Sequence, residues 1–373
     1  MSRVSLTFLW ETPARAIPVF SVFIPFFGCP RRCVFCSQHD QTGQQASPLD
    51  EILAHAAADL HARRAQGRPP VELAFYGGTF TALAPRDLDA CLDMADSLRR
   101  DGCITRFRCS TRPDRLDAAL LARLRRHGCR TVELGIQSFS DTALQASERH
   151  YSGRQATEAC RLVRDAGLAL GVQLLPGMPG HQPEDFLADV RRALDLGADM
   201  LRFYPCLVLA GTELARRWQQ GLYAPWPLPR TLSLLARGWL YARRAGVPVI
   251  RMGLAPEPGM EAALLAGPAD RNLGGRVLGR ALWLHVCACL LRTRGDDAAR
   301  SEVRAAALLD ALLAGGEAPA GLPRAQALYL PRSCQGFFRG PGDELGTAWA
   351  ALGITRRNLV WTAGQAASLH LDA

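Results

Sequence analysis

The sequence predicts an α/β protein built on a parallel sheet, and three observations support that prediction. Apolar runs of strand length alternate with helical patterns about every 30 residues, as far as residue 205. Strands that alternate with helices pair in parallel through right-handed crossovers. No G-x-G-x-x-G follows the first strand, which disfavours a dinucleotide-binding sheet. Six such units fit a partial (β/α)6 TIM-like barrel at least as well as an open doubly wound sheet.

The individual elements follow from apolar runs and helix-end signals. The six predicted strands cover residues 19–27, 71–76, 105–109, 131–136, 168–175 and 200–205. The predicted helices between them cover residues 49–65, 85–100, 116–127, 154–166 and 183–196. Ser47 and Pro48 suit the start of the first helix, and Gly128, Gly167 and Gly197 suit the ends of the last three.

The pattern changes at the proline-rich stretch 224–229, which marks a predicted boundary. Beyond it we expect a helix at residues 231–244, a strand at 247–254 and, after a Pro/Gly-rich turn, helical structure over 259–313. The last 60 or so residues are weakly patterned. The prediction is therefore a core barrel, residues 1–230, and a mostly helical C-terminal extension, residues 231–373, that closes or flanks it.

The composition restricts the chemistry and the compartment. The chain has 44 basic residues against 35 acidic ones, a formal net charge of +9, and every basic residue is arginine. A Schiff-base, P-loop or catalytic lysine is therefore excluded. A GC-rich codon bias and phosphate recognition by guanidinium both account for such arginine content. Because no signal peptide and no apolar run of membrane-spanning length stand out, we expect a cytoplasmic protein with reduced thiols and no membrane partner.

Three of the 12 cysteines form a compact motif directly after the first strand. Cys29, Cys33 and Cys36 have the spacing C-x3-C-x2-C, which suits a metal centre. A 4Fe-4S cluster held by three thiolates leaves one iron open for a substrate or cosubstrate. A structural zinc ion would need a fourth ligand, for which Cys109 and His39 are the candidates. We expect iron–sulfur in preference to zinc, and free structural thiols are a negligible third interpretation.

The cysteine motif, with the aromatic Phe35 before its last cysteine, resembles the signature of radical S-adenosylmethionine (radical SAM) enzymes. Further motifs end successive strands: FYGGTF at 75–80, STRPD at 110–114, ELGIQSF at 133–139, LLPGMPG at 174–180, RFYP at 202–205 and GTEL at 211–214. Over about residues 17–230 this set resembles the radical domain of the Elongator catalytic subunit, particularly its short bacterial relatives. The resemblance implies a barrel of the radical SAM type.

The resemblance also implies the cofactors and the reaction. Cys29, Cys33 and Cys36 would hold a 4Fe-4S cluster whose open iron chelates S-adenosylmethionine. An electron from a donor such as flavodoxin or ferredoxin would break the bond from the sulfonium to the ribose 5′ carbon. The resulting 5′-deoxyadenosyl radical would take a hydrogen atom from the substrate, while the protein positions the cofactor and excludes water.

Contacts to the cosubstrate are assigned by the same resemblance. Gly77, Gly78 and Thr79 end the second strand, where glycines let the backbone approach a ligand and donate hydrogen bonds to its methionine part. Gln137 and Arg149 match residues that contact the cosubstrate in related coproporphyrinogen oxidases, with Arg149 paired to a carboxylate.

Three further positions are less firmly tied to the family. Ser110 and Gln173 are also assigned to the cosubstrate, although many relatives have glutamate and aspartate there. Tyr204 suits either the barrel mouth or an ordinary strand position.

The sequence RVLGRA at 276–281 matches the coenzyme loop of the acetyltransferase domain in larger relatives. It lies in an apolar helical run, and too few residues follow residue 255 for such a domain, so acetyl-CoA is not expected as a partner.

Three functions remain open from the sequence. The first is a radical enzyme acting on tRNA or another RNA, for which arginine pairs offer a phosphate footprint. The second is a radical enzyme acting on a small metabolite, such as a tetrapyrrole. The third is a binding protein that keeps the cluster without turnover. Examples of these arginine pairs are Arg63-Arg64, Arg99-Arg100, Arg125-Arg126 and Arg191-Arg192.

Overall fold

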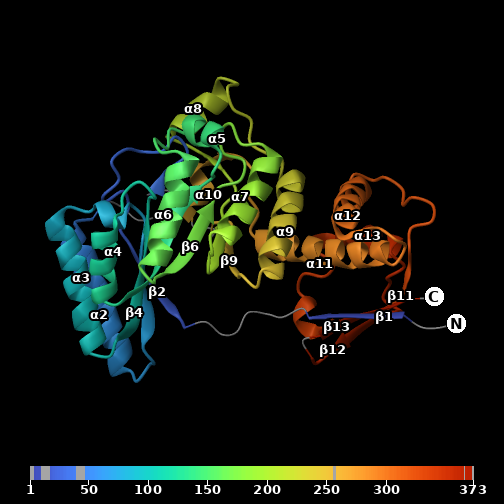
Figure 1. Ribbon diagram of the computed structural model, residues 1–373, viewed down its shortest axis with the longest axis horizontal. Helices are drawn as coiled ribbons and strands as arrows, with labels where there is room; N and C mark the ends of the chain where they lie inside the picture. Colours follow the sequence, from blue (N-terminus) through green and yellow to red (C-terminus); the bar gives the residue numbers. More distant parts are fainter. Residues whose placement is uncertain (1–3, 10–16, 39–46, 255–257, 365, 372–373) are drawn as a thin grey trace. The chain divides into compact units, whose positions relative to one another are not determined.

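The computed structural model describes residues 4–9, 17–38, 47–254, 258–364 and 366–371, which cluster into two compact units (Figure 1). The barrel unit comprises Arg15–Pro227 and Tyr241–Arg271. The C-terminal unit comprises Met1–Ala14, Leu228–Leu240 and Asn272–Ala373. This grouping differs from the predicted division at residue 230, because the N-terminal segment clusters with the C-terminal unit and residues 241–271 cluster with the barrel unit.

Seven parallel strands form the curled sheet of the barrel unit, in the order β2-β3-β4-β5-β6-β7-β9. The predicted partial barrel is therefore confirmed, and the strand expected at 247–254 adds a seventh member by pairing with β7. The strands are β2 (Val19–Phe23), β3 (Val71–Tyr76), β4 (Ile104–Thr111), β5 (Cys129–Gln137), β6 (Ala169–Leu174), β7 (Met200–Phe203) and β9 (Val249–Met252).

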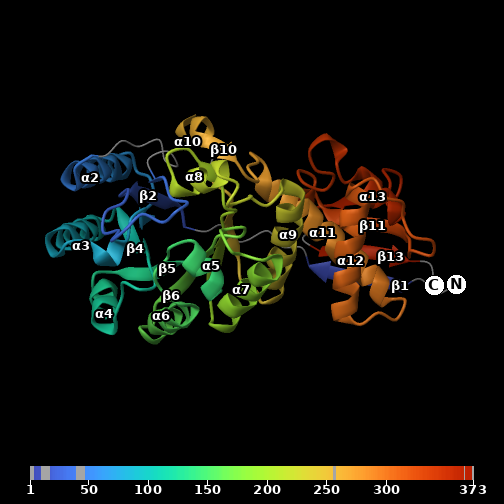
Figure 2. The ribbon, with the colours of Figure 1, turned by 90° about the horizontal axis from the view of Figure 1, so that it is seen from above.

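Helices connect these strands and cover the outside of the curve, as the view from above shows (Figure 2). The connecting helices are α2 (Leu49–Ala65), α3 (Pro85–Arg100), α4 (Ala118–Arg126), α6 (Gly153–Asp165) and α7 (Pro183–Asp195). Shorter elements are η1 (Phe80–Ala82), α5 (Asp141–Ala146), α8 (Glu213–Gln219), α10 (Pro258–Ala263), β8 (Val208–Leu209) and β10 (Leu264–Ala266). Helix α9 (Leu228–Arg244) contributes residues to both units.

Alternation along the strands sorts apolar and polar side chains onto opposite faces of the sheet. Phe75 and Phe107 are fully buried on the face that the helices cover, and Phe75 stacks on Phe80 with ring centroids 4.8 Å apart. Glu72 and Arg108 occupy alternate positions on the same strands and face the inside of the curve. The half-barrel thus has an apolar outer layer and a polar interior.

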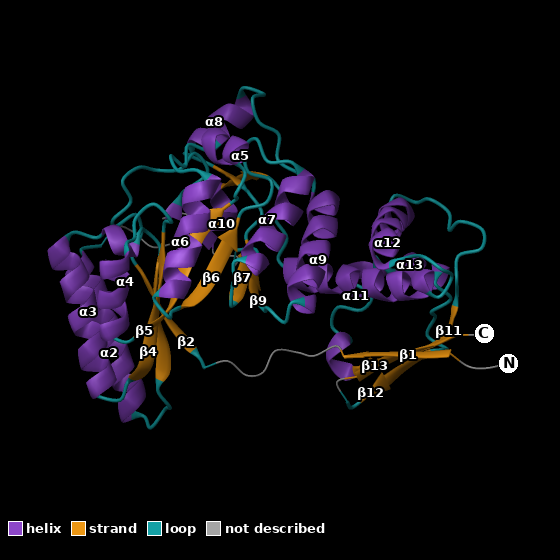
Figure 3. Cartoon of the chain, in the orientation of Figure 1, coloured by secondary structure: helices purple, strands orange, loops and turns teal. Residues whose placement is uncertain are grey.

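The C-terminal unit combines helices with a four-stranded sheet in the order β1-β13-β11-β12 (Figure 3). Its strands are β1 (Val4–Leu9), β11 (Ala325–Pro331), β12 (Leu359–Thr362) and β13 (Ala366–Leu371). Its helices are α11 (Leu273–Arg292), α12 (Ala298–Leu313), η2 (Arg332–Cys334), η3 (Pro341–Asp343) and α13 (Gly346–Ala351). The predicted helical character is confirmed for α11 and α12, whereas the sheet was not predicted.

Helix α11 accounts for the acetyltransferase-like motif and for the one apolar helix of membrane-spanning length among the described residues. Arg276 and Arg280 both pair with Glu344, at 2.6 and 2.9 Å. Gly279 is required for packing, because a Cβ there would lie 2.4 Å from the carbonyl oxygen of Phe337. The motif is therefore part of a packed helix and not a coenzyme loop. The apolar window of α11 is 72% buried inside the protein, as in the core helix of a globular domain.

Candidate functional site

The cysteine motif lies on the loop that follows β2, at the edge of the sheet where the parallel strands end. Cys29, Cys33 and Cys36 are all half-buried and carry free thiols. The loop packs directly on the Gly-Gly-Thr loop after β3, because a Cβ at Gly28 would lie 2.3 Å from the carbonyl oxygen of Thr79. The side chains of Cys29 and Thr79 share a hydrogen bond of 3.3 Å. Two motifs 50 residues apart in sequence are therefore one structural element.

The two predicted glycines are needed for this close approach. Gly77 and Gly78 both have positive φ, and a Cβ at Gly78 would lie 2.2 Å from the carbonyl oxygen of Phe27. The Gly78 N–H donates to Oε1 of Gln38 at 2.9 Å, and the Thr79 N–H donates to the Phe27 carbonyl at 2.7 Å. These N–H groups therefore hold the cysteine loop in place, and their predicted contact with a cosubstrate stays a prediction.

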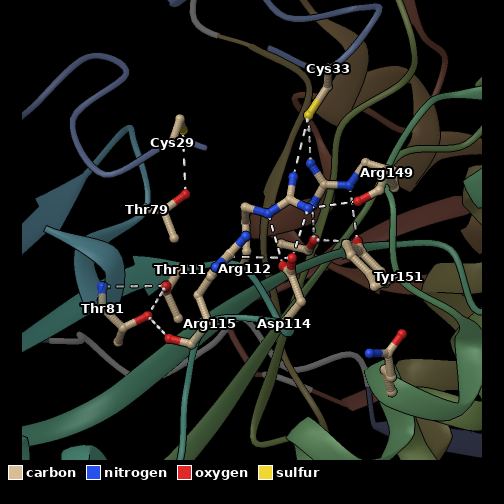
Figure 4. A network of polar contacts seen from close by, with 12 residues as sticks. Cys29, Cys33, Thr79, Thr81, Thr111, Arg112, Asp114, Arg115, Arg149 and Tyr151 are labelled. Carbon is tan, nitrogen blue, oxygen red and sulfur yellow. Dashed lines mark hydrogen bonds and ion pairs between the residues drawn. The ribbon is translucent and has the colours of Figure 1, made fainter. Parts of the chain in front are cut away.

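Two arginines converge on the sulfur of Cys33 (Figure 4). Nη1 of Arg149 donates to the sulfur at 2.8 Å, and Nη1 of Arg112 lies 3.8 Å from it. Arg112 is held by a two-pronged pair with Asp114, at 2.8 and 3.1 Å. Tyr151 accepts from Nε of Arg149 at 3.0 Å. The predicted residues Cys33 and Arg149 are thus brought together in the structure.

Arg149 is a buried cation, with only 4% of its surface exposed. In the described part of the chain, its polar partners are the Cys33 sulfur, the Tyr151 hydroxyl and the Gly135 carbonyl, and no carboxylate pairs with it. Burial alone would lower its pKa, but Tyr151 and Cys33 raise the pKa, so the guanidinium stays charged. Because an unpaired buried charge is costly, the position calls for an anion.

The pKa of two of the three thiols, those of Cys29 and Cys36, is raised in this environment. Burial, together with the neighbouring Cys33 and Cys29, raises the pKa of Cys36 to about 12. Burial likewise raises the pKa of Cys29. A bound metal would have to displace these protons, since thiolates are the ligands of iron–sulfur clusters.

The donor set fits a cluster better than a single zinc ion. Among the described residues, no three His, Cys, Asp or Glu side chains lie close enough together to hold one metal ion. Cys109, a candidate fourth zinc ligand, is fully buried and hydrogen-bonds Cys129 instead. His39 lies outside the described residues. In a 4Fe-4S cluster each thiolate binds a different iron, so three half-buried cysteines on one loop, near enough to affect one another's pKa, fit that group.

The other predicted positions lie deeper in the half-barrel. Gln137 ends β5 with a φ of +64°, a strained value for a non-glycine residue, and Gln173 on β6 donates to its side chain at 3.4 Å. Ser110 is half-buried on β4, opposite Glu133 of β5. Tyr204 is buried and accepts from Arg202 at 3.2 Å. The structure thus brings Gln137 and Gln173 together, with Ser110 on the strand next to β5.

A network of buried charges spans the interior below these residues. Nε of Arg202 on β7 lies 2.7 Å from Oε2 of Glu133 on β5, and Tyr76 on β3 donates to Glu133 at 3.0 Å. Arg108 pairs with both Glu72 and Glu133. Burial, followed by Glu133, raises the pKa of the Tyr76 phenol. Since β3 and β7 are not neighbours, only the concave face lets Arg202 reach the hydroxyl and the ring of Tyr76.

Sequence reasoning missed three residues that build the site. Arg112 and Tyr151 position the cation at Cys33, and Gln38 joins the two loops by accepting from the Phe26 and Gly78 N–H groups. Arg112 stood within a quoted motif, and its place at a strand end was the available signal. Tyr151 and Gln38 gave no comparable signal, because neither belongs to one of the quoted motifs.

Two family models match the chain. The model of the radical SAM superfamily matches residues 23–193, and the model of the radical SAM C-terminal domain matches residues 198–280. Together they cover more than half of the sequence.

Curated relatives and a solved structure agree with these models. A tRNA uridine(34) acetyltransferase of Dehalococcoides mccartyi (strain CBDB1) is 30% identical over 269 residues, which cover 63% of this chain and 57% of the relative. The heme chaperone HemW of Mycobacterium tuberculosis (strain ATCC 25618 / H37Rv) is 30% identical over 231 residues, which cover 60% of this chain and 58% of the relative. This chain thus spans little more than half the length of the curated relatives it matches.

The structure of Methanocaldococcus infernus Elp3 with an N-terminal deletion matches with a TM-score of 0.54 and 23% identity. The match covers 70% of this chain and 62% of that one, and it supports the fold. The order of motifs, the curled sheet and the two family models lead to the same assignment. The chain belongs to the radical SAM superfamily of enzymes.

Proposed function

We propose that this protein holds a 4Fe-4S cluster on Cys29, Cys33 and Cys36, cleaves S-adenosylmethionine reductively there, and acts on tRNA or another RNA. The buried Arg149 guanidinium beside the Cys33 sulfur is the observation that supports this most strongly. It has no carboxylate partner among the described residues, and both a cluster thiolate and the carboxylate of S-adenosylmethionine would supply the anion it needs.

When bound, the cluster supplies the electron that breaks S-adenosylmethionine into methionine and the 5′-deoxyadenosyl radical. The chain's own residues hold and enclose the reactants. The Gly77-Gly78-Thr79 loop fixes the cysteine loop, and Arg149 binds the negative charge. Gln137 and Gln173 present amide groups within the half-barrel, with Ser110 on the neighbouring strand. The electron comes from an external one-electron donor such as flavodoxin or ferredoxin.

Formation of 5′-deoxyadenosine tests the reaction. Reconstituted wild-type protein with dithionite and S-adenosylmethionine is expected to form 5′-deoxyadenosine, detected by liquid chromatography and mass spectrometry. Cys33→Ala removes a cluster ligand and should abolish the product, while Cys160→Ala, in the apolar core of α6, should retain it. A wild-type protein that holds the cluster but forms no 5′-deoxyadenosine would favour a non-catalytic binding protein.

The RNA substrate rests on the relatives named as tRNA uridine(34) acetyltransferases and on the Elongator-like motifs. Comparison of tRNA nucleosides by mass spectrometry, from strains with and without the gene, tests it. We expect one modified nucleoside to disappear in the deletion strain. An unchanged nucleoside profile would shift the proposal to a small-molecule substrate.

A second candidate is heme handling, which the equally strong identity to HemW favours. Heme titration followed in the Soret band separates the two candidates. Saturable one-to-one binding by the reconstituted protein, together with unchanged tRNA nucleosides, would support the heme function.

A further inference from the structure

Each cysteine of the motif has a different neighbour at its sulfur. Cys29 shares a hydrogen bond with the Thr79 hydroxyl, and the Gln38 side chain hydrogen-bonds Cys36. Among the described residues, guanidinium groups donate to the sulfur of Cys33 alone of the three, with Arg149 at 2.8 Å and Arg112 at 3.8 Å (Figure 4). The three ligand positions are therefore electrostatically unequal.

The two guanidiniums are held rigidly. Nη2 of Arg149 donates to the Gly135 carbonyl at 2.8 Å, and its Nε donates to Tyr151. Glu148 and His150, on either side of Arg149, both have positive φ, so the surrounding contacts hold this turn in a conformation that non-glycine residues rarely adopt. Nη2 of Arg112 donates to the Arg149 carbonyl at 2.6 Å. Arg112 therefore fixes the backbone that carries Arg149.

The charged side chains around the Cys33 sulfur have a net positive charge. Asp114 pairs with Arg112 and offsets its charge, whereas Arg149 has no carboxylate partner in the described part of the chain. Hydrogen bonds to cysteine sulfur and net local charge are two of the factors that set the reduction potential of an iron–sulfur cluster. A cluster becomes more negative when it accepts an electron, so a buried cation stabilises its reduced form.

We propose that Arg149 raises the reduction potential of the cluster through its hydrogen bond to Cys33, and that Arg112 is the positioning residue that keeps it there. This inference rests on the proposed function, because it requires the cluster. The cluster gains one electron from a one-electron donor and no bond of the chain is made or broken. The effect is present before S-adenosylmethionine binds, which separates it from a role for Arg149 in cosubstrate binding alone.

The test is a dye-mediated redox titration of reconstituted protein with dithionite, followed by electron paramagnetic resonance in the absence of S-adenosylmethionine. At the wild-type midpoint, Arg149→Gln should lower the ratio of reduced to oxidised cluster about tenfold, equal to about 59 mV for one electron. Arg149→Lys keeps the positive charge but not the planar guanidinium, so its ratio should lie between those of the wild type and Arg149→Gln. Arg112→Gln should lower the ratio less than Arg149→Gln.

Arg115→Gln is the matched control. Arg115 lies 3.6 Å from the same Asp114, but 44% of its side chain is exposed, so its loss should leave the midpoint unchanged. An Arg149→Gln midpoint equal to wild type, or an equal shift in Arg115→Gln, would overturn the proposal. Should Arg149→Gln fail to retain a cluster, Arg149→Lys and Arg112→Gln decide by the same criterion. A wild-type protein without cluster absorbance would instead contradict the proposed function.

Discussion

At Gly78 the backbone has a φ of +57°, and the carbonyl oxygen of Phe27 occupies the space that a Cβ would need. The carbonyl belongs to the cysteine loop, so this glycine sets the distance between two loops that build the site. Gly67 has a similar φ of +70° but no atom within 4 Å of its missing Cβ. A comparison of Gly78 with Gly67 therefore distinguishes the cost of a left-handed backbone from the cost of a steric collision.

Gly78→Ala is expected to reduce cluster content far more than Gly67→Ala. Both substitutions strain a left-handed residue, at a cost of about 1–2 kcal/mol in the free energy of unfolding. Only Gly78→Ala also displaces the cysteine loop. Iron and sulfide per chain after reconstitution, together with urea unfolding, measure the two effects. Equal cluster content in both variants would contradict the steric role of Gly78.

At the residue scale, sequence reasoning located the cysteines, the glycine pair and Arg149, but it did not predict their contacts. Arg149 was assigned to the carboxylate of the cosubstrate by resemblance, which stays a prediction, and the structure adds its contact with the Cys33 sulfur. Arg112 was seen only as part of a motif. Its role depends on Asp114 beside it and on the carbonyl of Arg149, 37 residues further on, and no local pattern reveals such a long-range contact.

At the element scale, helix α11 is joined to the loop before α13 by one carboxylate. Glu344 accepts from both Arg276 and Arg280, and its side chain is 18% exposed. Burial alone would raise its pKa, but the two guanidiniums outweigh burial, so the pKa of Glu344 is lowered. The pairing therefore stabilises the fold above the pKa of the unfolded carboxyl and is lost as the pH falls through the lower folded pKa.

Glu344→Gln should lower the free energy of unfolding at pH 7 by roughly 1.5–3 kcal/mol, the range for hydrogen bonds to charged groups. The difference from wild type should narrow at pH 4, because protonation begins to remove the same interaction from the wild-type protein. Urea unfolding at the two pH values measures this. Glu317→Gln, at an exposed position of the same unit, removes the same charge and should have little effect at either pH. A pH-independent difference for Glu344→Gln would contradict the ion-pair explanation.

The helices and strands of the barrel unit were predictable because each has a complete local pattern. Alternation of apolar runs and helix-ending glycines identified all six units. Strands β1 and β13 were not predicted, since they pair with each other from opposite ends of the chain. The 20-residue α11 was predicted only as part of a longer helical stretch, because three glycines and two internal arginines interrupt its apolar run.

For the whole molecule, the four arginine pairs named from the sequence, at the ends of α2, α3, α4 and α7, have a structural explanation. In each β/α unit the helix runs back along the sheet, so arginines in its last turn lie at the edge opposite the cysteine loop. There their positive charges interact favourably with the negative end of the helix dipole. Several also cover the glycine that ends the next helix: a Cβ at Gly128 would lie 3.2 Å from Arg99, and one at Gly167 would lie 3.2 Å from Arg125. These arginines are explained without RNA.

Replacement of Arg63, Arg100, Arg126 and Arg192 together by glutamine should therefore change tRNA affinity less than about twofold. Replacement of the exposed Arg31 and Arg32, on the cysteine loop itself, should weaken tRNA binding and reduce its salt dependence, with a slope change of about 0.9 per lost phosphate contact. Filter binding over a salt series measures both variants. The opposite ranking would place the RNA on the far edge of the barrel.

The pairing of β1 with β13 has a consequence for synthesis. At roughly 5–20 residues per second, tens of seconds separate translation of β1 from translation of its partner. During this time the β1 segment has no strand partner, and unpaired strands of this kind can associate with other chains. The strands of the curled sheet are all complete at Met252, before any of α11, α12 and strands β11 to β13 is translated. We therefore expect the half-barrel to fold first, and the four-stranded sheet to close only once β13 has left the ribosome.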